Sequence, residues 1–270
     1  MEETKKKRKK IWLVLFLIFL ICLIVCVFFL IKPYFTGENG SFNIGSVITN
    51  ISDEPTEPAL PEVEAKKDFT ELQLQNPDIY AWIYIPGTPV DYPILQNPDD
   101  NYYLRKDAYT KKYSIKGCIF TEVVNKKDFT DRNTIIYGHS GIRDHSFFTD
   151  LQLLSNAKNF EKIRNIYIYT PKKEFVYEIF AVAPHSDEHL MYTYDWDSKD
   201  EYDGFFEKLY SLIDTRVRFL NETKPDFDTD RMITLSTCLD GNHRNGRYLV
   251  FGRLIEEYNI KGAINNGLQN

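Results

Sequence analysis

The sequence is poor in the residues that hold metals, phosphates or disulfide frameworks. It has four cysteines in 270 residues, and Cys22 and Cys26 lie inside a long apolar run, so only Cys118 and Cys238 belong to the rest of the chain. It has no Cys-x-x-Cys pair, no His-x-x-x-His pair on a predicted helix and no glycine-rich phosphate loop. We therefore expect no metal, no cofactor and no disulfide scaffold, and the retained Cys238 calls for a chemical explanation.

Cys118 has a simpler interpretation than Cys238. It lies in the apolar run Gly117-Cys118-Ile119-Phe120 and is predicted to be a small buried filler. A disulfide between Cys118 and Cys238 would require their two strands to be neighbours.

Beyond the first 31 residues, acidic side chains outnumber basic ones. The net charge of −6 combines a basic start with residues 32–270, which carry 27 basic and 37 acidic side chains, a net charge of −10. Nucleic-acid-binding domains present basic surfaces, so nucleic acid is not an expected partner.

One apolar run is long enough to cross a membrane. Residues 11–31 contain no charge, and 21 helical residues at ~1.5 Å per residue span about 30 Å, the thickness of the hydrocarbon layer. The alternative is a cleaved signal peptide, but its apolar region would be shorter and would end in small residues. Residues 5–10 are all basic, which predicts that residues 1–10 form a cytoplasmic tail and that residues 32–270 lie outside the cell membrane.

The remainder divides into a linker, a domain and a tail. Residues 32–66 hold several glycines, prolines and acids but few large apolar side chains, which predicts an extracellular linker. A folded domain is predicted over residues 67–262, followed by a short tail over residues 263–270.

The pattern within the domain is mainly β. Eight strand-like runs are separated by turn-forming pairs such as Pro-Gly and Asn-Pro, which predicts a closed or nearly closed eight-stranded β-barrel. The eight runs are Tyr80–Ile85, Val90–Leu95, Gly117–Thr121, Asn133–Tyr137, Asn165–Thr170, Phe175–Ala183, Met232–Cys238 and Tyr248–Ile255. Helices are predicted over Val63–Gln75, around Phe147–Leu154 and around Tyr202–Phe219, the last with Phe205, Phe206, Leu209, Leu212 and Ile213 as its packing face.

The most informative segment runs from Ile233 to Arg247. Cys238 ends an apolar strand, and Arg247 begins the next strand after a turn-rich stretch. If these strands form an antiparallel hairpin, Cys238 and Arg247 face each other across the base of the loop. A thiol is a nucleophile, and a guanidinium that stays charged can stabilise an oxyanion. Arg244 is an alternative, but a strand position is stiffer than a loop position.

His139 is the expected acid/base among five histidines. It follows the strand Asn133–Tyr137 and Gly138, where a buried strand emerges at a bend. The other four histidines lie in polar, loop-like segments and are predicted to be solvated. A thiolate–imidazolium pair between Cys238 and His139 would be favoured by their proximity and by Arg247.

At these residues the chain resembles a sortase, and most closely a class B sortase. The resemblance is carried by Thr234-Leu235-Ser236-Thr237-Cys238 with its following arginine, by Tyr137-Gly138-His139, and by a long helical insert before the cysteine strand. It covers residues 69–255 and includes Asn101-Tyr102-Tyr103-Leu104. The resemblance implies a sortase-type β-barrel, a membrane anchor and transpeptidation at the surface of Gram-positive bacteria.

The resemblance also assigns roles to residues. It makes Cys238 the nucleophile, His139 the acid/base and Arg247 the stabilising cation, with Ser236, Asn101 and Thr237 lining the substrate groove. It implies cleavage of a C-terminal sorting signal after threonine, a thioester on Cys238 and transfer to an amine of the peptidoglycan precursor. Two alternatives fit the same residues: a surface cysteine protease that only hydrolyses, and a non-catalytic peptide-binding module.

Overall fold

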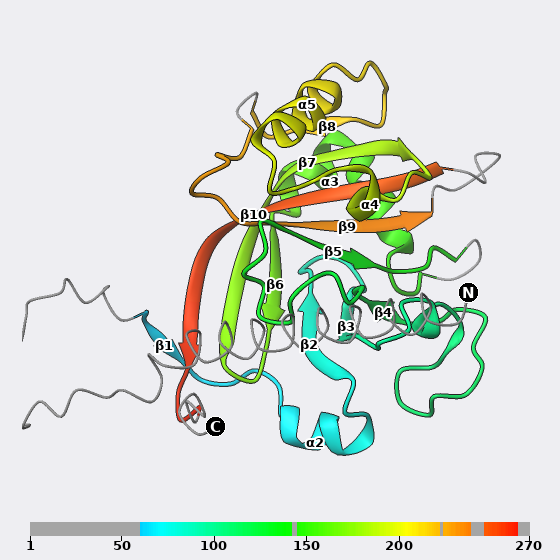
Figure 1. Ribbon diagram of the computed structural model, residues 1–270, viewed down its shortest axis with the longest axis vertical. Coiled ribbons are helices and arrows are strands. Elements are labelled where there is room, and N and C mark those ends of the chain that lie inside the picture. The colour runs from blue at the N-terminus through cyan, green and yellow to red at the C-terminus, as the bar shows by residue number, and fades with distance from the viewer. Residues whose placement is uncertain (1–59, 142–144, 222–223, 239–245, 264–270) are drawn as a thin grey trace, which may run out of the picture. The chain divides into compact units, whose positions relative to one another are not determined.

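The computed structural model describes residues 60–141, 145–221, 224–238 and 246–263 (Figure 1). The predicted cytoplasmic tail, membrane span and most of the linker therefore lie outside the described residues, as does most of the predicted C-terminal tail. Within the described ranges no helix is long and apolar enough to cross a bilayer. Residues 58–270 form a compact unit of their own.

Eight strands close into a barrel, as the sequence predicts. Around the ring they follow the order β10-β9-β5-β4-β3-β2-β6-β7, and β7 pairs with β10 to close it. The strands are β2 (Ile79–Tyr84), β3 (Asp91–Leu95), β4 (Ile119–Phe120), β5 (Asn133–Tyr137), β6 (Asn165–Tyr169), β7 (Lys173–Ser186), β9 (Met232–Cys238) and β10 (Gly246–Ile260). Two-residue strands β1 (Glu62–Val63) and β8 (Arg218–Phe219) pair with β10 and β7 outside the ring.

The barrel interior is an apolar core because side chains alternate between the two faces of each strand. Inward-facing residues such as Ile83, Ile136, Ile233 and Val250 are completely buried in one cluster. The core thus fixes which residues of β5 and β9 point inward, and with them the side chains at the strand ends.

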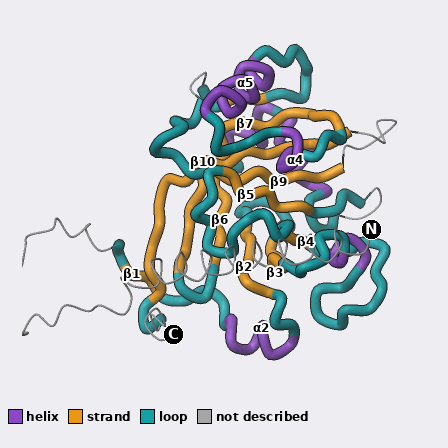
Figure 2. The backbone as a smooth tube through the Cα atoms, in the orientation of Figure 1, coloured by secondary structure: helices purple, strands orange, loops and turns teal. Residues whose placement is uncertain are grey.

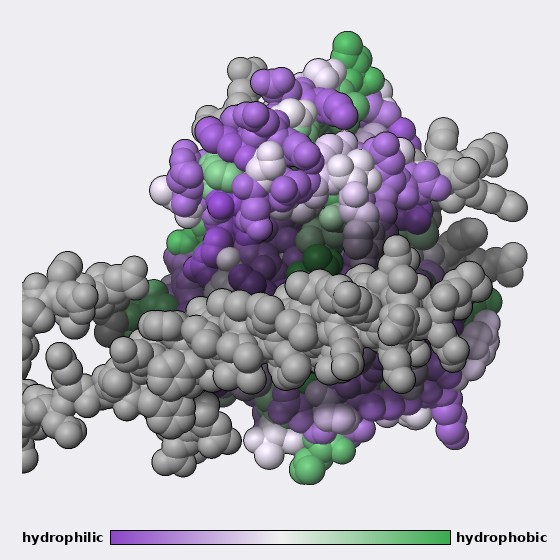
Figure 3. Space-filling model, in the orientation of Figure 1, coloured by the Kyte–Doolittle hydropathy of each residue, from purple (hydrophilic) through white to green (hydrophobic). Residues whose placement is uncertain are grey.

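A second apolar cluster covers the outside of the barrel. Helix α5 (Lys199–Tyr210) packs Phe205, Phe206 and Leu209 against outward-facing residues of β7 and β10. Its other face is hydrophilic (Figure 3). The helix is shorter than the predicted Tyr202–Phe219, because the Asp214 carboxylate accepts the backbone N–H of Arg216 and turns the chain toward β8.

The expected packing face of this insert is therefore wrong at its end. Leu212 is 39% exposed and Ile213 fully exposed, since both follow the last helical residue. The apolar residues keep a helical spacing in the sequence beyond Tyr210, although the helix itself ends there.

The first helix is also shorter than predicted. Helix α2 spans Phe69–Gln75, and the Asp68 carboxylate caps it by accepting the N–H groups of Thr70 and Glu71. Of the preceding residues predicted to be helical, Val63 lies in β1, and residues 64–68 belong to neither a helix nor a strand.

Short helices fill the remaining connections (Figure 2). The helix predicted around Phe147–Leu154 is present as a 3-10 helix, η3, over Thr149–Ser155. The others are the 3-10 helix η2 (Tyr102–Arg105), α3 (Ala157–Lys162) and α4 (Leu190–Thr193).

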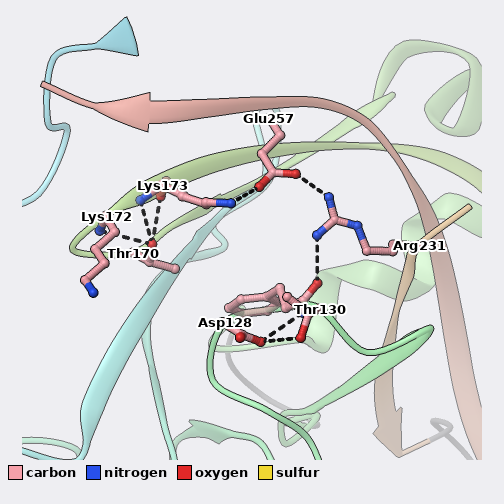
Figure 4. Close-up of polar contacts among 8 residues, drawn as sticks. Asp128, Thr130, Thr170, Lys172, Lys173, Arg231 and Glu257 are labelled. Atoms are coloured by element: carbon pink, nitrogen blue, oxygen red, sulfur yellow. Dashed lines mark hydrogen bonds and ion pairs between the residues drawn. The ribbon is translucent and has the colours of Figure 1, made fainter. Parts of the chain in front are cut away.

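One ion-pair cluster links three barrel strands away from the catalytic-motif residues. Glu257 of β10 accepts from Lys173 of β7 and from Arg231, which directly precedes β9 (Figure 4). Burial would raise the pKa of Glu257, but these two hydrogen bonds and charges outweigh it and hold the pKa below its usual value.

Candidate active site

Cys238 and Arg247 are direct partners across the β9–β10 ladder. Cys238 is the last residue of β9, and its thiol is exposed. Arg247 is the second residue of β10 and is half-buried. The hairpin predicted from the sequence is confirmed, although the connecting residues 239–245, which include Arg244 and His243, lie outside the described residues.

His139 reaches the same place from the other side of β9. Strands β5 and β9 run parallel with Tyr137 opposite Ser236, and the Gly138 N–H donates to the Ser236 carbonyl at 3.1 Å. Continuing this register by two residues brings His139 level with Cys238. Because neighbouring strands lie about 4.8 Å apart, Cys238 is flanked by His139 on one side and Arg247 on the other.

The glycine at position 138 allows the chain to pass close to Phe148 and bring His139 level with Cys238. A Cβ at position 138 would lie 2.5 Å from the ring of Phe148, which is fully buried. The Phe148 N–H also donates to the carbonyl of His139 at 3.2 Å. A side chain at position 138 would therefore displace the residue that holds the backbone of His139.

The imidazole of His139 is fixed by a backbone carbonyl. Its Nε2 lies 3.0 Å from the oxygen of Leu104. A carbonyl can only accept, so Nε2 carries the proton, and in the neutral ring Nδ1 is the basic nitrogen. This contact selects the tautomer in which Nδ1 can exchange a proton.

The Arg247 side chain is held by the backbone of the preceding residue. Its Nη1 donates to the Gly246 carbonyl at 3.2 Å. Within the described part of the chain it makes no ion pair with a carboxylate, so its charge is not neutralised by a fixed partner. A guanidinium in this state can donate to an anion that forms beside Cys238.

All six residues predicted from the sequence line one groove of about 230 Å³. Cys238, His139 and Arg247 share it with the three expected substrate contacts, Asn101, Ser236 and Thr237. Ser236 and Thr237 are buried, and the Thr237 hydroxyl has no hydrogen-bond partner among the residues that the structure describes. The structure thus brings the predicted set together; their individual roles stay predictions.

The groove wall also holds an ion pair that was not predicted from the sequence. His189 Nε2 lies 2.6 Å from Glu122 Oε1, and both residues line the groove. Glu122 is 8% exposed, and burial raises the pKa of its carboxyl. Since Glu122 lies just beyond β4 and His189 just before α4, the pair ties the end of β4 to the start of α4.

Two predictions about histidines are therefore wrong. His189 is a paired groove residue, and His185 lies in β7 and lines the groove as well, so neither sits in a simple solvated loop. No sequence signal joins Glu122 and His189, which are 67 residues apart. His145 is mostly exposed, with Nδ1 2.7 Å from Asp150.

Cys118 behaves as the buried filler that the sequence predicts. It is 2% exposed and packs in an apolar cluster, and burial raises the pKa of its thiol strongly. Both described cysteines are free, so no disulfide joins Cys118 to Cys238. Among the described residues no group of three His, Cys, Asp or Glu side chains is placed to hold a metal ion.

Comparison with known proteins decides the family. The sortase domain family model matches residues 83–255. This chain belongs to the sortase family. It is 31% identical over 196 residues to sortase B of Listeria monocytogenes, covering 71% of this chain and 76% of that protein. Sortase B of Staphylococcus aureus is 27% identical over 194 residues, with the same two coverages.

Solved sortase B structures share the fold. A Bacillus anthracis sortase B structure is 30% identical with a TM-score of 0.58, covering 74% of this chain and 89% of the solved one. The Clostridium perfringens sortase B structure is 26% identical with a TM-score of 0.60, covering 70% of this chain and 100% of the solved one. The class B resemblance seen in the sequence is therefore confirmed, and sortases are cysteine transpeptidases that anchor surface proteins.

Proposed function

We propose that this sortase is a membrane-anchored transpeptidase that cleaves a C-terminal sorting signal after threonine and transfers the protein to an amine of the peptidoglycan precursor. The observation that carries the proposal is the register of three adjacent strands. It places His139, Cys238 and Arg247 side by side at one end of the barrel, where they open on a common groove.

In the first step the Cys238 thiolate attacks the threonine carbonyl carbon. The carbonyl π electrons move to oxygen, and Arg247 donates to the oxyanion that forms. When the tetrahedral intermediate collapses, the peptide C–N bond breaks and the leaving amine takes a proton from the His139 imidazolium. The product is a thioester on Cys238 and a free C-terminal fragment.

In the second step an acceptor amine attacks the thioester. His139, now neutral, takes the proton that the amine loses, and the C–S bond breaks to return the Cys238 thiolate. The new amide joins the surface protein to the acceptor, and the thiolate–imidazolium pair is restored.

Asn101, Ser236 and Thr237 bind the sorting peptide in this scheme. They lie in the same groove as the thiol, and the Thr237 hydroxyl is a buried polar group without a partner. Support comes from a S. aureus sortase B–substrate complex, which is 25% identical to this chain with a TM-score of 0.60, covering 72% of this chain and 87% of the solved one.

The anchor is proposed from the sequence. Residues 1–10 lie in the cytoplasm, residues 11–31 cross the cell membrane once, and residues 32–66 link the span to an extracellular catalytic domain over residues 67–262, which residues 263–270 follow as a tail.

The test is product analysis with residues 58–270, a threonine-containing peptide library and an added amine. Transpeptidation yields a new amide at threonine, whereas a protease would yield only the free acid with or without amine. A peptide-binding module would yield neither product. The Cys238→Ala variant is expected to lose both products, and turnover by that variant would remove Cys238 from the mechanism.

A further inference from the structure

A basic lobe stands out on this otherwise acidic sortase. We define it as residues 105–116, from the last residue of η2 toward β4; in Figure 1 it is the long loop that projects beyond β4 at the lower right. It carries five cations and one acid, a net charge of +4, whereas residues 32–270 together carry −10. The cations are Arg105, Lys106, Lys111, Lys112 and Lys116.

The lobe is a built structure with its own hydrogen bonds. Lys106 and Tyr113 form an antiparallel bridge, and the Ser114 N–H donates to the Arg105 carbonyl at 3.0 Å. The Arg105 side chain crosses to the Ile115 carbonyl at 2.9 Å. These hydrogen bonds fix the backbone of the lobe and therefore the positions from which its side chains extend.

That scaffold leaves two large apolar side chains in solvent. Tyr113 is 71% exposed at the bridge to Lys106, and Ile115 is 68% exposed in the turn that the Gly117 N–H closes on the Ser114 carbonyl, so the lobe presents both side chains to solvent. The exposed Lys112 and Lys116 frame them. Single exposed apolar residues are ordinary, but an aromatic and an aliphatic side chain set between lysines are what the headgroup layer of an anionic bilayer accommodates.

We propose that the basic lobe docks on the surface of an anionic lipid bilayer. Tyr113 and Ile115 enter the boundary between headgroups and acyl chains, and the exposed Lys112 and Lys116 face the anionic headgroups. Because residues 32–270 are net acidic while the lobe carries +4, an anionic membrane favours the orientation in which the lobe faces the bilayer.

Because the proposed anchor keeps the catalytic unit near the bilayer, even a weak contact between the lobe and the lipid is enough for docking. Only 28 residues separate the predicted span from the first described residue, which limits the reach of the catalytic unit to about 100 Å from the bilayer. At such a short tether the local concentration of membrane surface is high, and modest affinity gives substantial occupancy.

Docking would also fix the position of the groove. The base of the lobe adjoins Leu104, whose carbonyl holds the His139 imidazole, so the lobe and the candidate active site share one rigid support. The bound lobe keeps the groove at a constant height over the membrane. The inference takes only the membrane anchor from the proposed function.

The test measures partition of residues 58–270 onto vesicles. This unit is compact by itself, and it includes residues 83–255, which the sortase domain family model matches, so it is expected to fold without the anchor. Vesicles of phosphatidylglycerol and phosphatidylcholine are compared with phosphatidylcholine alone. We expect binding only to the anionic vesicles, weakening as salt is raised.

Two lobe variants and two matched controls make the test specific. K112Q/K116Q and Y113S/I115S should each reduce the partition coefficient about tenfold. K158Q/K162Q removes two exposed lysines of α3, and L74S/I213S removes two apolar side chains that are at least as exposed; both should bind like the parent. Unchanged melting temperatures show that the variants are folded.

Parent binding that does not depend on anionic lipid, lobe variants that bind like the parent, or controls that lose as much as the lobe variants would each overturn the proposal. Peptide turnover by residues 58–270 in solution is measured separately. Its loss would count against the proposed chemistry, while failure of vesicle binding with intact turnover would count against the docking alone.

Discussion

Cys238 and Arg247 occupy paired positions at the open end of the β9–β10 ladder, so the thiol and the guanidinium belong to neighbouring strands with a fixed register. This pairing gives the site a cation that moves little when charge develops at the reacting carbonyl. Preorganised charge of this kind is what lowers the barrier to an oxyanion.

Replacing Arg247 should therefore slow the chemistry more than it weakens peptide binding. We expect Arg247→Ala to lower kcat by about 10²–10³ and Arg247→Lys to recover part of the loss, because an ammonium keeps the charge without the fork of donors. Steady-state kinetics on a sorting peptide measure both constants. Arg253→Ala, further along the same strand, is the control; an equal fall of kcat there would contradict a local role for Arg247.

Gly138 should not tolerate even a methyl group. In Gly138→Ala the new Cβ meets the Phe148 ring at 2.5 Å, so we expect a loss of about 1–3 kcal/mol in the free energy of unfolding and a drop in turnover. Urea unfolding and peptide cleavage measure the two effects. Gly204→Ala in α5 meets no atom within 4 Å and should stabilise slightly; equal behaviour of the two variants would refute the close-packing argument.

The Glu122–His189 pair should act on substrate binding. It joins the two walls of the groove, so Glu122→Gln is expected to raise KM for the peptide about three- to tenfold with a smaller change in kcat. Glu188→Gln makes the same charge change at an exposed position in the same groove and should leave KM near that of the parent. An unchanged KM in Glu122→Gln would show that the pair does not shape the groove.

Acid should weaken the fold through Glu257. Its folded pKa is lowered, so its contribution to stability is present above the unfolded pKa of about 4.3 and is lost as the pH falls through the lower folded pKa. We expect the free energy of unfolding to fall more steeply below pH 5 in the parent than in Glu257→Gln, with the two converging in strong acid. Urea unfolding at several pH values checks this, with exposed Glu256→Gln as control; parallel curves for parent and Glu257→Gln would contradict it.

Much of the fold follows from local pattern. The eight ring strands lie where alternating apolar runs and turn residues place them, because a barrel strand must bury one face. The lengths of the helices are harder to predict from the sequence. Tyr210 ends α5 because of a turn built around Asp214 and Arg216, which spacing of apolar residues does not reveal.

In the candidate site, too, some residue relationships can be predicted from the local sequence and others cannot. The Cys238–Arg247 relationship can be read from a hairpin of adjacent strands. The alignment of His139 with Cys238 depends on parallel pairing between β5 and β9, strands about 100 residues apart, so only the family motif points to it. The Glu122–His189 pair depends on how the insert folds back on the barrel and has no local signature.

Intact-mass spectrometry of the enzyme during turnover tests the central claim most directly. Residues 58–270 incubated with a sorting peptide should gain the mass of the acyl part that ends at threonine, without the released C-terminal fragment, as a thioester that maps to Cys238, is removed by hydroxylamine, and forms far more slowly in His139→Ala. An acyl group found on another residue, or full acylation in Cys238→Ala, would contradict the account.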